Sequence, residues 1–197
     1  GANADALIVG MVAERDSWTD PITFDGVDMT AVIGPSGERN SIWYLNMSDT
    51  TYTGGAADLV LDLTTSGGGA GYGLGVVSVS AGGDVRVHAQ NEFPGSNTIS
   101  LTTTKANTFV VAANYANAAV GSSSVNSPLA QLLGAQVGSA QGAVGYADQL
   151  AGTSSYSFSA DATGNTSAVA FIPEPGSFAL MAGLAGLAGV ALQRRRR

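Results

Sequence analysis

Short runs in which apolar and polar residues alternate recur along most of this chain. The clearest run is residues 58–64, where Leu59, Leu61 and Leu63 occupy every second position. A period of two places these side chains on one face of a β-strand, so the leucine face is expected in the core. Residues 5–13 show a different pattern, a nearly continuous apolar run that is also of strand length.

Comparable segments predict further strands, which are separated by turns rich in glycine and proline. They are residues 22–24, 27–31, 41–47, 74–80, 85–87, 98–103, 107–113, 154–159 and 167–172. Asp25 and Gly26 form a sequence typical of a two-residue hairpin turn, and residues 34–37 predict another turn.

The pattern is weakest in residues 116–152. This stretch is rich in Gly, Ala, Ser and Gln, and it predicts a long loop or one irregular strand near residues 143–146. Outside residues 173–197, the segment that most resembles a helix is residues 128–133. The sequence therefore predicts an all-β fold, an antiparallel, jelly-roll-like β-sandwich, followed by a single hydrophobic C-terminal helix.

Composition narrows the class of protein. Glycine supplies 27 of the 197 residues and charged residues only 12%, a profile typical of secreted β-proteins with many turns. The absence of cysteine excludes a disulfide scaffold and a zinc–thiolate site. Residues 1–172 hold fourteen Asp and Glu and four Lys and Arg, so their formal net charge of −10 disfavours nucleic acid as a partner.

Few residues have the arrangement that catalysis requires. His88 is the only histidine, and no Gly-x-Ser-x-Gly motif accompanies it. Asp58 and Asp62 lie on the face opposite the leucines and are most simply explained as solvated carboxylates. The sequence therefore predicts a protein without catalytic residues and without a cofactor.

Two polar features are candidate ligand contacts. Asp16 with Asp20, and Asp25 with Asp28, are spaced so loosely that they predict at most a weakly held calcium ion. Trp18 lies in a polar segment and is the aromatic residue best placed to contact a glycan.

The end of the chain has a distinct organisation. Two prolines favour an extended, exposed peptide, a run of seventeen uncharged residues follows, and a basic cluster closes the sequence. The uncharged run is near the lower limit of a membrane span, about 17–25 residues, and the basic cluster would hold its end in the cytoplasm. The residues alone predict a short span that is either processed or a permanent anchor. The three parts are Pro173-Glu174-Pro175, residues 176–192, and Arg194, Arg195, Arg196 and Arg197.

This arrangement resembles the PEP-CTERM sorting signal of Gram-negative bacteria that produce exopolysaccharide. The resemblance covers residues 173–197 and includes the adjacent Gly176 and Ser177. It implies that an exosortase, a membrane-embedded cysteine protease, processes the tail near Pro173, Glu174 and Pro175. It also implies two parts, an exported body of residues 1–172 and a sorting tail that anchors the protein transiently in the inner membrane.

A second resemblance covers roughly residues 4–115. Ala6 to Gly10, Ile22 to Thr30 and Ile42 to Leu45 follow an order similar to that of sandwich modules in bacterial secreted surface proteins. Those modules are generally of unknown function, so the resemblance implies a fold and a location more than an activity.

Together these features predict an exported, non-catalytic protein of the cell surface or extracellular matrix. Three alternatives stay open: a carbohydrate-binding module for exopolysaccharide, a self-assembling filament or coat subunit, and a glycan-active enzyme. The self-assembly alternative rests on residues 5–13, because a strand at the chain terminus can pair in its own sheet or in a neighbour's.

Overall fold

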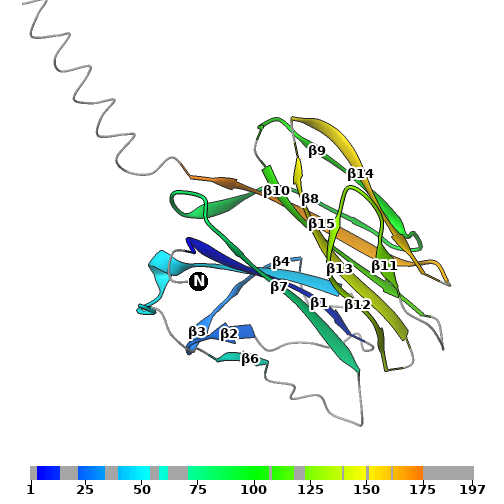
Figure 1. The fold of residues 1–197 in the computed structure, drawn as a ribbon, viewed down its shortest axis with the longest axis horizontal. Helices are drawn as coiled ribbons and strands as arrows, with labels where there is room; N and C mark the ends of the chain where they lie inside the picture. Colours follow the sequence, from blue (N-terminus) through cyan, green and yellow to red (C-terminus); the bar gives the residue numbers. More distant parts are fainter. Residues whose placement is uncertain are drawn as a thin grey trace, which may run out of the picture.

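The protein is all-β and its strands pair antiparallel, in four sheets among the residues that the structure describes (Figure 1). The structure is a computed structural model. It describes residues 4–13, 22–33, 40–53, 58–61, 71–106, 108–117, 123–138, 140–149, 151–160 and 162–174.

Two larger sheets form the body. The four-stranded sheet has the order β4 (Thr30–Ile33), β5 (Asn40–Asn46), β1 (Ala6–Ala13) and β7 (Tyr72–Val79). The five-stranded sheet has the order β12 (Ala130–Val137), β13 (Ala140–Gln149), β10 (Thr108–Ala116), β15 (Gly164–Pro173) and β8 (Val85–Phe93).

Two smaller sheets lie outside them. One has the order β11 (Ser124–Val125), β14 (Gly152–Ser159) and β9 (Thr98–Thr103). The other has the order β3 (Val27–Asp28), β2 (Ile22–Phe24) and β6 (Leu59–Leu61). A short 3-10 helix, η1 (Met47–Asp49), follows β5.

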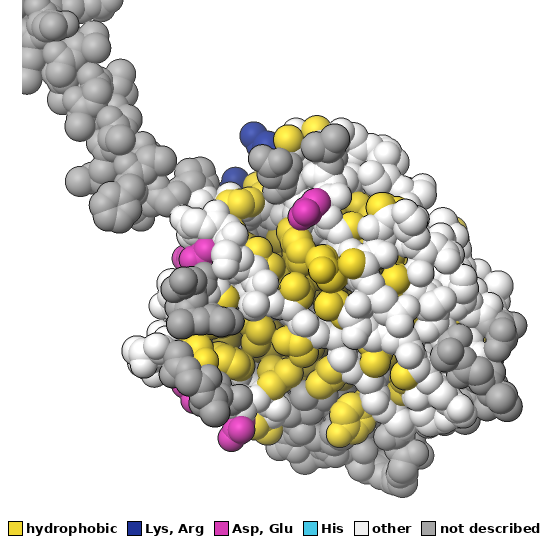
Figure 2. Space-filling view, in the orientation of Figure 1, with side chains coloured by type: hydrophobic (Ala, Val, Ile, Leu, Met, Phe, Trp, Pro, Cys, Tyr) yellow, Lys and Arg dark blue, Asp and Glu magenta, His cyan; other side chains and the backbone are white. Residues whose placement is uncertain are grey.

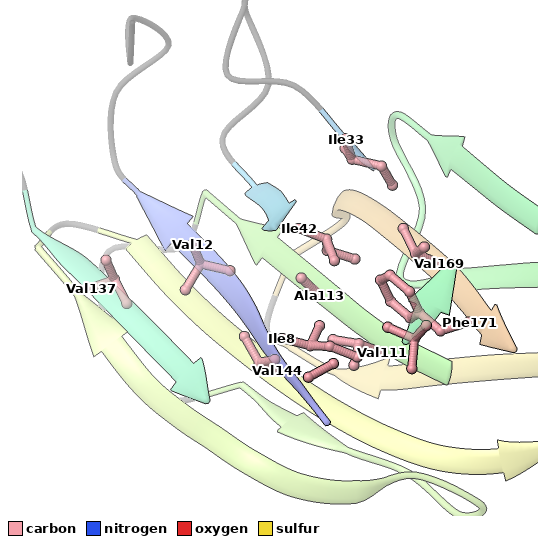
Figure 3. Close-up of a cluster of buried hydrophobic side chains, with 12 residues drawn as sticks. Ile8, Val12, Ile33, Ile42, Val111, Ala113, Val137, Val144, Val169 and Phe171 are labelled. Carbon is pink, nitrogen blue, oxygen red and sulfur yellow. The ribbon is translucent and has the colours of Figure 1, made fainter. Parts of the chain in front are cut away.

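The main core lies between the two larger sheets (Figure 3). Ile8 and Val12 of β1 pack against Val111, Val144 and Phe171 of the five-stranded sheet, and all five side chains are buried. Burying a side chain of this size stabilises the fold by about 1.5–3 kcal/mol, so this cluster is a major source of stability.

Both larger sheets are also covered on their outer faces. Tyr156 and Phe158 of β14 pack on Val110 of β10, while Ile22 of β2 packs with Val9 of β1. The strands in the middle of each large sheet are therefore buried on both sides. This explains why β1 is apolar almost throughout, since neither face of the strand meets water.

Paired glycines let the larger sheets approach closely. Gly10 of β1 and Gly75 of β7 are opposite each other, and both lie against Val144 of β13. A Cβ added at Gly10 would lie 2.5 Å from Val144 Cγ1, and one added at Gly75 would lie 2.8 Å from Val144 Cβ. Gly142 of β13 packs against Val12 of β1 in the same way, since a Cβ added at Gly142 would lie 2.4 Å from Val12 Cγ2. Each valine fills the space that a glycine leaves on the facing sheet.

Most of the strands predicted from the pattern are confirmed. Residues 5–13, 41–47, 74–80, 98–103 and 154–159 correspond to β1, β5, β7, β9 and β14. The turn at Asp25 and Gly26 is also confirmed, because both residues have positive φ angles, 50° and 77°, as a two-residue hairpin turn requires.

The leucine row of residues 58–64 is described only in part. Leu59 is half-buried and packs on the outer cluster of the four-stranded sheet, while Asp58 and Val60 are exposed, as the alternation predicts. The Leu61 side chain and Leu63 lie outside the described residues, as does the turn predicted at residues 34–37.

The prediction of a loop in residues 116–152 was wrong. This stretch contains β11 and a hairpin of β12 and β13. Residues 128–133, which most resembled a helix, are a turn followed by the start of β12. Residues 143–146 do form a strand, but as part of the ten-residue β13 at an internal position of the sheet. Its small residues are required by close packing on both faces rather than by a loop.

Tyr156 gives the fold a predicted sensitivity to alkaline pH. Burial raises the pKa of the Tyr156 hydroxyl, which donates a hydrogen bond of 2.5 Å to Gln149 Oε1, and a hydrogen bond to Ser154 lowers that pKa by less. Because the folded pKa is raised, the resulting stability is fully present below the unfolded value of about 10 and is lost as pH rises through the folded pKa.

We therefore expect the free energy of unfolding to fall above about pH 10, and to fall less steeply in the Tyr156→Phe variant. That variant should lose about 1–3 kcal/mol at neutral pH, because Gln149 Oε1 loses its donor. Urea unfolding at a series of pH values measures both effects. Tyr72→Phe is the matched control, since Tyr72 is exposed, and equal pH profiles for the two variants would contradict the assignment.

Candidate functional site

The predicted processing motif begins where the last core strand ends. Ile172 is buried at 7% exposure, whereas the next two residues, Pro173 and Glu174, are exposed. Pro173 is the last residue of β15 and lies opposite Val85 of β8. The Glu174 N–H donates a hydrogen bond of 2.6 Å to the Asp84 carbonyl oxygen. The peptide is therefore fixed to the body up to Glu174.

The turn that accepts this hydrogen bond is itself held by side chains. The Asp5 carboxylate accepts hydrogen bonds from the N–H groups of Ala81 and Gly82, at 2.6 and 2.8 Å. Ser48 Oγ donates to Asp84 Oδ1 at 2.7 Å. A hydrogen bond between neutral groups contributes about 0.5–1.5 kcal/mol and one to a charged group about 1.5–3 kcal/mol, so this turn is a firm anchor for the end of β15.

Asn46 adds a further clamp on β8 at the same end. Its amide accepts a hydrogen bond from the Val85 N–H at 2.8 Å and donates one to the Val85 carbonyl at 3.2 Å. Val85 is the residue opposite Pro173, so the clamp fixes the strand beside the motif.

Two shallow pockets flank Pro173. One, of about 290 Å³, is lined by apolar side chains that include Val79, Phe109 and Phe171, with Asp148 as its charged group. The other, of about 250 Å³, is lined by Arg86, Lys105, Ala106, Ile172 and Pro173. The point where the tail leaves the body is thus apolar and acidic on one side and cationic on the other.

Sequence reasoning missed this cationic pair. Arg86 and Lys105 are the only Arg and Lys among the described residues, and both are exposed beside the motif. They are far apart in the chain, and only the pairing of β8 with β15 brings Arg86 beside Ile172. No sequence pattern links them.

The other predicted site residues are mostly outside the described residues. These are Pro175, Arg194, Arg195, Arg196, Arg197, Trp18, Asp16, Asp20 and Asp62. Asp25 lies in the hairpin turn and Asp28 is exposed on β3. Within the ranges that the structure describes, no three His, Asp or Glu side chains come together in a way that could hold a metal ion.

His88 has a structural contact. Its Nε2 accepts a hydrogen bond from the Thr104 N–H at 3.0 Å and lies 3.2 Å from the Thr104 hydroxyl. Nε2 acts as the acceptor in the hydrogen bond with the Thr104 N–H. His88 thereby ties β8 to the turn that follows β9.

Buried asparagines link the sheets at the end of β15 remote from the motif. Asn40 Nδ2 donates to the carbonyl oxygens of Ala113 and Asn165, at 3.1 and 3.0 Å, and so joins β5 to the five-stranded sheet. Asn114 Nδ2 also donates to the Asn165 carbonyl at 3.3 Å, to Thr166 Oγ1 at 2.9 Å and to Asn97 Oδ1 at 3.2 Å. The Nδ2 groups of Asn40 and Asn114 therefore bond backbone carbonyls of the sheets and help to hold the sheets together.

In the part of the chain that is described, no helix is long and apolar enough to cross a membrane. Comparison with protein families, curated proteins and solved structures found no match to this chain.

Proposed function

We propose that this is an exported, non-catalytic protein of the cell surface or extracellular matrix, sorted by its C-terminal tail. In this proposal, residues 1–172 are the exported body and residues 173–197 are the signal. An exosortase-type membrane protease is the processing partner, and the inner membrane holds the tail until processing takes place in a Gram-negative host.

The order of residues in the tail carries the proposal. Pro173-Glu174-Pro175, an uncharged run and four arginines occur in the order of a sorting signal. The position of the motif supports it, because β15 completes its pairing at Pro173. Cleavage beyond Glu174 would leave Ile172 and the rest of the described core in place.

The finer description of the fold belongs to the same proposal. We infer that the body is a β-sandwich, with the four-stranded and five-stranded sheets as its layers, and that residues 176–192 form one helix. The shared cluster of Ile8, Val12, Val111, Val144 and Phe171 supports the layered arrangement. The jelly-roll connectivity stays a prediction.

The mass of the protein recovered from its native location tests the function. We expect a mature protein that lacks the arginine cluster and ends close to Pro175, because that is where the resemblance places processing. Surface protein that still ends in Arg197 would show a permanent anchor and contradict the processing step.

Exopolysaccharide binding is the second candidate, and one surface favours it. On the exposed face of β9 and β14, Ser100 and Ser155 are joined at 2.9 Å, and Thr102 and Thr153 at 2.7 Å. Paired hydroxyls keep unused donor and acceptor capacity for a neutral polyol. A glycan pull-down with the host's own polysaccharide distinguishes this candidate from a protein that binds no glycan.

A further inference from the structure

The described part of the chain contains two positive charges without a partner. Arg86 of β8 and Lys105, in the turn that follows β9, are its only Arg and Lys, whereas it holds nine Asp and Glu. Even so, neither charged group forms an ion pair or a hydrogen bond with any described residue. Both side chains are exposed and line one pocket. Two like charges in one pocket repel each other, and a bound anion would offset that repulsion.

These charges lie where the last strand ends. Figure 2 shows Lys and Arg side chains together at one edge of the molecule, beside the end of β15 in Figure 1, whereas Asp and Glu side chains are scattered over the same face. Arg86 is opposite Ile172 in the pairing of β8 with β15. Lys105 follows Thr104, which is hydrogen-bonded to His88, two residues after Arg86. The fold therefore brings together two cations that are far apart in the chain.

The rest of the pocket is apolar and small. Its other lining residues are Ala106, Ile172 and Pro173, and its volume is about 250 Å³. Pockets that enclose a drug-sized ligand measure about 300–1,000 Å³, so this one fits a single small group. Two cations bind a carboxylate through charge-assisted hydrogen bonds, and a guanidinium group can form two of them at once. An apolar wall packs against the carbon–hydrogen face of a sugar ring. Together these features fit one acidic sugar residue.

Exposed hydroxyl groups lie close to this pocket. The cross-strand pairs Ser100–Ser155 and Thr102–Thr153 are on β9 and β14. Thr102 is three residues before Lys105, so at most about 11 Å separates their Cα atoms. Serine and threonine hydroxyls both donate and accept hydrogen bonds, as the neutral hydroxyls of a sugar chain do. A short oligosaccharide can therefore contact the hydroxyl pairs and the cationic pocket at the same time.

From these observations we propose that Arg86 and Lys105 form a subsite for the carboxylate of a uronic acid in an acidic polysaccharide, whose neighbouring sugar residues contact the hydroxyl pairs of β9 and β14. This subsite rests on the second candidate function, glycan binding, and gives that function its class of ligand.

The spacing of charges disfavours other polyanions. Duplex DNA carries one charge per about 1.7 Å of its axis, so most of its phosphates would be repelled by a body with a net charge of −10. A polysaccharide with widely spaced carboxylates meets less repulsion, because only the carboxylate at the pocket has to approach the protein closely.

Two probes that differ only in charge test the subsite. They are a galacturonic acid tetrasaccharide and the same tetrasaccharide with its carboxylates methyl-esterified. Each is titrated into the full chain in nonionic detergent, and NMR measures its Kd. One exposed ion pair changes Kd by up to about fivefold, so two should make the acid bind about 25-fold more tightly than the ester. Added salt should weaken binding of the acid and leave binding of the ester unchanged.

Variants of the two cations place the effect in the pocket. Arg86→Gln and Lys105→Gln should each weaken binding of the acid about fivefold, and the double variant should bind acid and ester alike. Both side chains are exposed and unpaired among the described residues, so the variants should fold normally, which circular dichroism checks. Gln90→Glu is the matched control, since Gln90 is exposed on the same strand outside the pocket and its replacement also lowers the net charge by one. It should change Kd by less than about twofold, because salt screens a charge at that distance.

Three other outcomes would overturn the subsite. Equal binding of acid and ester, unchanged in the variants, would leave a surface that binds neutral glycans without a carboxylate subsite. Inorganic sulfate that displaces the acid at equal concentration would show a pocket for any small anion rather than for a sugar. Failure of both probes to bind would remove the glycan-binding candidate together with its subsite. Sorting by the C-terminal tail would stand in each case, because none of these measurements involves processing.

Discussion

Replacing Arg194, Arg195, Arg196 and Arg197 by glutamate should stop maturation and leave unprocessed precursor in the cell. The expected effect is close to complete, because in the proposed function the basic cluster holds the end of the uncharged run in the cytoplasm. If the tail is a sorting signal, the seventeen uncharged residues before the cluster would then lack the positive charges that arrest them in the inner membrane. Mass spectrometry of the surface fraction and of the membrane fraction measures the loss of mature protein and the retention of precursor.

A variant with four lysines is the control for this experiment. Replacing the same four arginines by lysine keeps the positive charge, and the positive-inside effect uses Lys and Arg alike, so maturation should proceed. Failure of the lysine variant would show that the guanidinium groups are recognised individually, which contradicts a role through charge alone. Normal maturation of the glutamate variant would remove the main support for a sorting signal.

Each part of the fold that the sequence predicted has a pattern that is visible within a few neighbouring residues. In β9, every second residue is exposed and the residues between them are buried, so hydrophobicity alternates with the period of a strand. In β1, the whole strand is apolar, and its length alone indicates a strand. The hairpin at Asp25 and Gly26 was predictable because few residues other than Gly, Asn and Asp tolerate its positive φ angles.

β13 shows why the prediction of the fold was incomplete. Its sequence, Ala140 to Gln149, has small and polar residues with no clear alternation, yet nearly all of it is buried. Gly142 faces Val12 on one side, and Gly145 faces Val125 on the other. Neighbouring sheets pack closely on both faces of β13, and only small residues fit there. In a single sequence, a segment made of small residues is easily mistaken for a loop. The sequence of β13 does not show which residues pack against it, because partners such as Val12 are far away in the chain.

Only part of the candidate site could be predicted from the sequence. Pro173, Glu174 and Pro175 stand out because they precede an uncharged run, which is a local pattern. The hydrogen bond from Glu174 to Asp84 and the cationic pocket beside Pro173 depend on the pairing of β15 with β8, which no local pattern reveals. The same holds for β1, because its own sequence does not show that it pairs with β5 on one side and β7 on the other.

Substitution of Gly75 by alanine should destabilise the body although alanine is the better strand residue. Removing a glycine from a strand favours folding by about 0.5–1 kcal/mol through the lower entropy of the unfolded chain. The added Cβ, however, would lie 2.8 Å from Val144 Cβ and 2.9 Å from Leu132 Cβ. These atoms are next to the backbone and cannot rotate away, so the larger sheets must separate. Overpacking of this kind costs about 1–3 kcal/mol, and we expect it to exceed the gain.

Two further variants show whether contact with Val144 is the cause. Val144→Ala should cost less stability in the Gly75→Ala background than in the wild type, because it removes Val144 Cγ1, which would lie 2.8 Å from the added Cβ, and a double-mutant cycle measures that coupling. Gly82→Ala is the control for backbone strain, since Gly82 has a φ of 77° and open space around it. If urea unfolding shows Gly75→Ala to be as stable as the wild type, the close approach of the two sheets at Gly10 and Gly75 is wrong. If the cycle shows no coupling, the loss arises from Leu132 rather than from Val144, and the sheets are held apart at a different contact.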